Sequence, residues 1–364
     1  MTSFQFEYTG NLKWLPGSVI YFTRHGSHAY GTALPESDMD IRGVCIAPRR
    51  YHLGFERFDE HEQKVPDLKI FELRKFVELA LDANPNVLEL LYTEPEDHLL
   101  VTPLGQKLLD NRDLFLSKRC RSSFSGYAMG QMKRINSHYK WLSNPPKAPP
   151  TRAEFELPTR DEVPANQLQA ARAAVQKQVD EWEWRKLEGV DPSTRIDIKN
   201  EFFRRLLDIT LWNWDEAHDK LYPAAANKLG FDTNFILLLE KERHYTNALN
   251  NWNSYVEWQE GRNQARAALE AKFGYDTKHC MHLVRLFRMC KEILIEGVVR
   301  VRRPDAADLL EIRHGKMFYP DVVKLSEEMD AEIAELAKKC TLPLSPDRDK
   351  VAALFEELLV TSWG

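Results

Sequence analysis

The sequence predicts an α+β protein in which a small domain with a mixed sheet precedes a larger α-helical region. Runs rich in β-branched and aromatic residues, typical of strands, lie at 18–24, 38–48 and 64–73. From about residue 103 onward, almost every segment shows helical periodicity instead. The chain has 364 residues, enough for two or three domains.

The second strand has an alternating pattern. In "DMDIRGVCIAP" (38–48), Met39 and Ile41 alternate with Asp38 and Asp40. Successive side chains of a strand point to opposite faces. We therefore expect Met39 and Ile41 to face the core, and the two carboxylates to point together to the other side.

The helices have recognisable start and stop signals. Pro85 should end the first of them, because proline disfavours helical geometry at the preceding residue. Asp276 and Gly297 are suited to begin and end a later one. The proline-rich segment 143–164 should form a loop. Helices are expected at 73–83, 116–142, 165–187, within 234–273, at 276–297, and near 320–339 and 347–360.

These patterns divide the chain into four segments. We expect an α/β domain at 1–100, a helical extension at 101–142, a helical elaboration with its proline-rich loop at 143–273, and a C-terminal helical region at 274–364.

Composition excludes several classes of protein. No run of 18 or more apolar residues predicts a transmembrane helix, and the N-terminus lacks the pattern of a signal peptide. The five cysteines include no C-x-x-C pair, which argues against a disulfide framework or a cysteine zinc site. We expect a cytoplasmic protein without a membrane partner. The net charge of −5 argues against a broad nucleic-acid surface, but it allows a local basic groove.

Asp38 and Asp40 are candidate metal ligands. Two carboxylates held together on one strand face repel each other, so they call for a cation unless one is protonated. Oxygen ligands without His or Cys favour a hard ion, Mg²⁺ or Mn²⁺, which commonly also binds substrate phosphates.

A glycine-serine corner follows the first strand. Gly26 would let the backbone approach a ligand closely, and Ser27 offers a hydroxyl. Backbone N–H groups at such a turn, leading into a short helix, suit an anion such as phosphate. Tyr30 and Arg42 lie near this corner in sequence, where either phosphate contact or ordinary surface placement fits them.

Gly26-Ser27 followed after ten residues by Asp38-x-Asp40 resembles the signature of the DNA polymerase β-like nucleotidyltransferase superfamily. The wider string "GSHAYGTALPESDMDIRGV" resembles one branch, the predicted nucleotidyltransferases of bacteria and phages known as the RNA-repair-pathway polymerase β family. The resemblance is weaker from about 143 to 262. It extends over the blocks at 67–92, 126–135, 274–294 and 303–323.

The resemblance implies a polymerase β-like palm domain with three carboxylates and two metal ions. Asp67, at the start of the third strand, would be the third carboxylate, with Glu72 as its rival. The implied reaction moves a nucleoside monophosphate from an NTP to an acceptor hydroxyl and releases pyrophosphate. An RNA 3′ end is the acceptor that the family context favours. Alternatives are nucleotidylation of a protein or small molecule, and a nucleotide-binding module without turnover.

The segment "DTKHCMHLVRLFR" offers a second set of candidates. On a helix, Lys278, His282 and Arg285 share one face with His279, and this face could bind the triphosphate. A solvated amphipathic face is the alternative. Zinc binding by His279 and His282 is poorly supported, because two histidines without further ligands seldom suffice.

The basic run "RVRRP" (300–304) has two interpretations. It could contact a polyanionic acceptor, or it could be a solvated charge cluster.

Overall fold

The computed structural model describes residue 8 and residues 10–158, 233–262 and 264–364. The helix predicted at 165–187 lies outside these residues. The chain forms two compact units. The first unit comprises residues 1–143 together with 263–364, and the second unit comprises residues 144–262. The α/β domain and the C-terminal helices therefore belong to one body, although they are far apart in the sequence.

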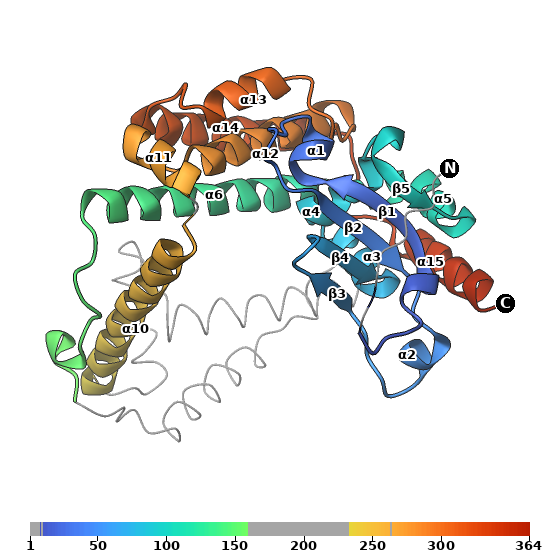
Figure 1. The fold of residues 1–364 in the computed structure, drawn as a ribbon, viewed down its shortest axis with the longest axis horizontal. Helices are drawn as coiled ribbons and strands as arrows, with labels where there is room; N and C mark the ends of the chain where they lie inside the picture. Colours follow the sequence, from blue (N-terminus) through green and yellow to red (C-terminus); the bar gives the residue numbers. More distant parts are fainter. Residues whose placement is uncertain (1–7, 9, 159–232, 263) are drawn as a thin grey trace. The chain divides into compact units, whose positions relative to one another are not determined.

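A five-stranded mixed sheet forms the N-terminal part of the first unit, in the order β3-β4-β2-β1-β5 (Figure 1). The predicted α+β class is confirmed. Strand β2 runs antiparallel to β1 and parallel to β4, while β3 and β5 complete the two edges in antiparallel pairing. The strands are β1 (Val19–His25), β2 (Asp40–Cys45), β3 (Glu60–Gln63), β4 (Leu68–Glu72) and β5 (His98–Val101).

The three predicted strands correspond to β1, β2 and β4, each with shifted or shortened ends. Strands β3 and β5 were not predicted; both are edge strands of four residues without fully buried positions. An edge strand that buries no complete face does not need the alternating pattern by which strands are recognised.

Both faces of the sheet are covered. Alternate strand residues such as Tyr21, Val44 and Phe71 join the large core that the sheet shares with the helices. Their neighbours Phe22 and Ile70 belong to a smaller core under the N-terminal segment. Burial on both sides fixes the register of the central strands, and hence the position of any side chain at their ends.

Helices pack on the face of the sheet that belongs to the large core, and they extend from it. Helix α12 lies along α6 in Figure 1 and also packs against α13 and α14. The helices of the first unit are α1 (Gly26–Tyr30), α2 (Arg49–Leu53), α3 (Leu73–Leu81), α4 (Pro85–Leu88), α5 (Pro103–Asp110), α6 (Arg119–Ser143), α11 (Gln264–Phe273), α12 (Thr277–Glu296), α13 (Ala306–Arg313), α14 (Tyr319–Lys339) and α15 (Arg348–Trp363). Short 3₁₀ turns are η1 (Pro16–Ser18), η2 (Glu89–Tyr92), η3 (Pro95–Asp97) and η4 (Arg112–Phe115).

The predicted helix signals are confirmed. The Asp276 side chain accepts a hydrogen bond from the His279 backbone N–H, and Gly297 ends α12 with a φ of 69°. Helix α3 ends at Leu81, and Pro85 occupies the first turn of α4, where its missing N–H costs nothing.

One burial prediction is wrong. Met39 is 42% exposed, whereas Ile41 is buried as expected. The reason is the strand boundary: β2 begins at Asp40, so Asp38 and Met39 precede the sheet and are not held by its alternation.

The second unit contains η5 (Arg152–Phe155) and α10 (Thr233–Glu260) among its described residues. Arg152 forms an ion pair with Glu242 of α10. All five cysteines of the chain are free and buried. No helix among those that the structure describes combines the length and the apolar character needed to cross a membrane.

Candidate active site

A cavity of about 450 Å³ lies in the first unit, bordered by α1, the starts of β2 and β4, and helices α11 to α13. This volume is within the usual range for small-molecule sites. It brings together all of the predicted site residues except Arg285. Those that line it are Gly26, Ser27, Asp38, Asp40, Asp67, Lys278 and His282.

The sheet places Asp40 and Asp67 side by side. Strands β2 and β4 are parallel, with Ile41 paired to Leu68, and the Ile41 N–H donates to the Asp67 carbonyl at 2.8 Å. Asp40 and Asp67 therefore lie at the beginning of two adjacent strands, at the same end of the sheet. Asp38 comes two residues earlier and is exposed to the cavity.

Arg42 is the nearest cation to this pair. Its guanidinium donates to Asp67 Oδ1 at 2.8 Å, and it lies 3.4 Å from Asp40 Oδ1. Burial raises the pKa of Asp40, and a hydrogen bond with Asp67 raises it further. Burial also tends to raise the pKa of Asp67, but hydrogen bonds from Arg42 and Asp40 outweigh it and hold that pKa below its ordinary value. One guanidinium cannot neutralise the charge of two carboxylates, so the pair is suited to bind a further cation.

Glu72 lies elsewhere. It is at the opposite end of β4, where its carboxylate caps α3 by accepting from the Arg74 N–H at 2.7 Å. It also lies 3.1 Å from His52 Nε2, and burial raises its pKa to about 7. Of the two candidates for a third carboxylate, Asp67 is therefore the one at the cavity.

Gly26 is needed for the close approach of α1 to Asp40. Its φ is +62°, in the left-handed region that glycine tolerates best. A Cβ atom at this position would lie 2.0 Å from Asp40 Oδ2. Ser27 follows in the same turn and lines the cavity beside the carboxylates.

The prediction that Arg285 binds phosphate is wrong. Arg285 is 4% exposed, and its guanidinium donates to Glu89 Oε1 at 2.6 Å while lying 3.8 Å from the centre of the Tyr30 ring. Tyr30 donates to the other Glu89 oxygen at 2.6 Å. Arg285 comes seven residues after Lys278, which is a rise of about 10 Å along the helix. Two residues on the same helix face can therefore lie in different surroundings, one at the cavity and one in the core.

The Arg285 cluster instead connects distant elements. Glu89 comes from η2, Tyr30 from α1 and Arg285 from α12. Burial disfavours ionised Glu89, but the Arg285 charge, the neighbouring His25 and the hydrogen bond from Tyr30 outweigh it and lower the pKa of Glu89 to about 2. A fully buried ion pair thus fixes α12 to the end of the sheet next to the cavity.

The cavity also includes residues that the sequence did not single out. Arg313 and His314, at the end of α13, and Glu36, before Asp38, are among its lining residues. The block at 303–323 belonged to the family resemblance, but no spacing rule distinguished Arg313 from the other basic residues near it.

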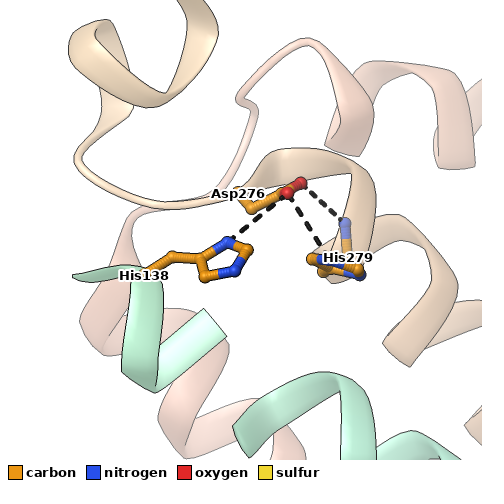
Figure 2. A group of neighbouring side chains, drawn as sticks. All are labelled: His138, Asp276 and His279. Atoms are coloured by element: carbon orange, nitrogen blue, oxygen red, sulfur yellow. Dashed lines mark hydrogen bonds and ion pairs between the residues drawn. The ribbon is translucent and has the colours of Figure 1, made fainter. Parts of the chain in front are cut away.

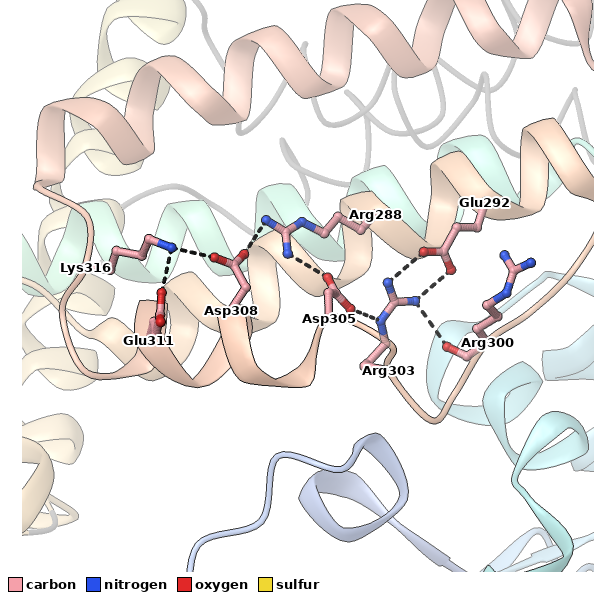
Figure 3. Close-up of polar contacts among 8 residues, drawn as sticks. All are labelled: Arg288, Glu292, Arg300, Arg303, Asp305, Asp308, Glu311 and Lys316. Carbon is pink, nitrogen blue, oxygen red and sulfur yellow. Dashed lines mark hydrogen bonds and ion pairs between the residues drawn. The ribbon is translucent and has the colours of Figure 1, made fainter.

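The arginines of the basic run at 300–304 are paired with carboxylates. Figure 3 shows a chain of ion pairs between α12 and α13, in which Arg303 contacts both Glu292 and Asp305. The other pairs are Arg288 with Asp305 and Asp308, Lys316 with Asp308 and Glu311, Arg300 with Glu296, and Arg302 with Asp97. This agrees better with a surface charge cluster than with a groove of excess positive charge.

Comparison with known proteins identifies the N-terminal region. Residues 6–143 match the model of the RNA repair pathway DNA polymerase beta family, which confirms the resemblance seen in the sequence. The matched region contains the glycine-serine corner and the three carboxylates.

Two relatives are themselves uncharacterised. A 38.9 kDa protein from the nrdC-mobD intergenic region of Enterobacteria phage T4 is 31% identical over 125 residues, which are 30% of this chain and 36% of the phage protein. The protein YcgL of Bacillus subtilis (strain 168) is 22% identical over 205 residues, which are 50% of this chain and 76% of the relative. The first match thus spans about a third of the phage protein's length. No solved structure matches the chain.

Proposed function

We propose, from the premise that residues 6–143 are those of an RNA repair pathway DNA polymerase beta family member, that the protein is a metal-dependent nucleotidyltransferase. It would move a nucleoside monophosphate from an NTP to an acceptor hydroxyl and release pyrophosphate. The observation that supports this most strongly is the pair of adjacent carboxyl groups, Asp40 and Asp67, at one cavity with Asp38, Ser27 and Lys278.

The donor set fits a hard divalent cation. Asp38, Asp40 and Asp67 offer oxygen atoms alone, which suit Mg²⁺ or Mn²⁺. The described lining residues include four carboxylates and two permanent cations, Lys278 and Arg313. A triphosphate would add to this excess of negative charge, so its binding calls for metal ions. When bound, such ions offset the triphosphate charge and lower the pKa of the attacking hydroxyl.

The chain's own residues would bind and orient the substrate. Ser27 and the backbone beside Gly26 would hold the terminal phosphates in line with the acceptor. Lys278 and His282 are one turn apart on α12 and both line the cavity, where the Lys278 ammonium would offset phosphate charge and a His282 ring N–H could donate to a phosphate oxygen. Asp67, whose side chain is 45% exposed against 28% for Asp40, is the more open of these two adjacent carboxylates.

The family description favours an RNA hydroxyl as the acceptor. The paired charges of the run at 300–304 do not favour a long RNA-binding surface. A single RNA 3′ end reaching the cavity agrees with both observations. Proteins and small molecules remain the alternative acceptors, and a nucleotide-binding module without turnover remains the alternative class.

The test is transfer of label. The protein would be incubated with Mg²⁺, each α-labelled NTP in turn, and total cellular RNA or protein, and covalent label would be followed on each acceptor. We expect Asp67→Asn to abolish labelling, and Glu72→Gln, a change on the same strand outside the cavity, to preserve it. Nucleotide binding without label on any acceptor would support the binding module instead.

A further inference from the structure

Three side chains outside the carboxylate site form a separate cluster. His138 comes from α6, Asp276 is the residue that caps α12, and His279 lies in the first turn of α12 (Figure 2). Their candidate ligand atoms all lie within 4.8 Å of one another. The side chains are 10%, 1% and 13% exposed, respectively, so the cluster is largely buried.

The distances in the cluster suit ligands around an ion better than direct hydrogen bonds. Asp276 Oδ2 lies 3.7 Å from His138 Nδ1 and 3.5 Å from His279 Nε2. Good N–H···O bonds span about 2.7–3.2 Å. Two ligand atoms at about 2.0–2.1 Å from a tetrahedral zinc ion are about 3.4 Å apart. Modest side-chain movement would bring all three ligand atoms onto one metal ion.

The hydrogen bonds around the cluster orient its ligand atoms. His279 Nδ1 lies 2.7 Å from Gln131 Oε1, an oxygen that can only accept, so with this amide orientation Nδ1 carries the hydrogen. The lone pair of Nε2 then faces Asp276. Asp276 Oδ1 accepts from the His279 N–H at 3.0 Å, and Oδ2 is the oxygen that lies near both imidazoles. A histidine held through its other ring nitrogen is the usual arrangement of a metal ligand.

A second buried carboxylate lies beside the cluster. Glu270 of α11 is 1% exposed, and its Oε1 is 3.9 Å from His138 Nδ1. The Glu270 carboxylate adds negative charge beside the three side chains, which favours a cation over an anion at the cluster.

We propose that His138, Asp276 and His279 bind one divalent transition-metal ion of the zinc class. The imidazole ligands distinguish this site from the oxygen-only site for Mg²⁺. The metal would join α6 to the end of α12 where Lys278 and His282 line the cavity. Its role is therefore to fix the position of these two side chains, whatever reaction the cavity supports.

The experiment measures bound metal rather than activity. The full chain would be purified without a metal-affinity column, and its metal content determined by plasma mass spectrometry. We expect about one zinc-class ion per chain. Asp276→Asn keeps a good helix-capping side chain but removes the charge, so the protein should stay folded and lose the metal. His279→Gln should also lose the metal. Both variants should lack the ligand-field absorption that Co²⁺ gives when it is bound to the wild-type protein.

Two controls make the result specific. His244→Ala removes an exposed histidine of α10 and should retain the metal, as should Asp38→Asn combined with Asp40→Asn. Gln131→Leu removes the outer hydrogen bond and should weaken metal affinity about 10- to 100-fold. The proposal would be overturned by wild-type protein that neither contains zinc nor gains thermal stability when zinc is added. Full metal content in folded Asp276→Asn and His279→Gln would overturn it equally. A zinc-loaded protein without nucleotidyl transfer would contradict the proposed function alone.

Discussion

Replacing Gly26 by alanine probes the contact between the glycine-serine corner and the carboxylates. Two separate costs are expected. An alanine in the left-handed region costs about 1–2 kcal/mol of stability. Its Cβ would also lie 2.0 Å from Asp40 Oδ2, so the Asp40 side chain must move. Displacing a catalytic group by about 1 Å is enough to lower the rate on the order of 100-fold.

Gly31→Ala separates these two costs. Gly31 also has a positive φ, +75°, but a Cβ there would meet its nearest atom, in Arg302, at an ordinary 3.5 Å. Both variants should lose about 1–2 kcal/mol in urea denaturation because of their backbone conformation. Gly26→Ala should show a further loss, and the double variant Gly26→Ala with Asp40→Ala should recover this additional part.

The matching functional assay is Mg²⁺-dependent pyrophosphate release from an NTP. Gly31→Ala should remain close to the wild type, whereas Gly26→Ala should fall about 100-fold. If the two variants had equal stability and equal activity, the close approach of Gly26 to Asp40 would have no role at the site, and the reasoning would be refuted.

Three further predictions concern charge. Lys278→Ala should weaken NTP binding about 10- to 150-fold, because a hydrogen bond to a charged group contributes about 1.5–3 kcal/mol. Lys291→Ala, on the same helix but outside the cavity, should leave NTP binding unchanged, and equal dissociation constants of the two variants in calorimetry would contradict this prediction. Arg285→Ala should cost about 3–5 kcal/mol at pH 7, because it leaves Glu89 buried without its cation. Folding lowers the pKa of Glu89 from 4.5 to about 2, so the stability that its ionised carboxylate contributes is present above pH 4.5 and is lost as the pH falls toward 2. In urea denaturation, the difference in stability between Arg285→Ala and the wild type should therefore be smaller at pH 3 than at pH 7. Asp40→Asn should leave the melting temperature without Mg²⁺ equal or higher, because it removes one of two adjacent carboxylates, and a clear decrease would contradict the repulsion between them.

Much of the sheet and most helix ends followed from local sequence rules. The strand around Ile41 alternates at its start because Ile41 is buried while Asp40 and Arg42 on the other face are only partly so, and α12 has its Asp276 cap and its Gly297 stop. The short edge strands β3 and β5 were missed because neither buries a full face. Met39 was misplaced because periodicity does not reveal at which residue a strand begins.

The candidate site was predictable where a motif fixes residues along the chain, and less so where folding brings distant segments together. The corner at Gly26 and the pair Asp38 and Asp40 could be recognised from their spacing alone. Arg285 was misassigned because helical spacing defines a face but not what covers it, and Glu89 covers it here. The partner of His279 was invisible for a similar reason: His138 lies on a different helix, 141 residues earlier in the sequence than His279.

The most direct test of the central claim is Mg²⁺-dependent pyrophosphate release by the wild type and by the variant carrying Asp38→Asn and Asp40→Asn. Folding of the variant would be checked by circular dichroism. Wild-type protein should release pyrophosphate from an NTP as Mg²⁺ is titrated, with an RNA 3′ end present as acceptor. The folded variant should show only the rate seen without Mg²⁺. A variant whose release and Mg²⁺ dependence equal those of the wild type would contradict the assignment of these carboxylates as the metal-binding groups of a nucleotidyltransferase.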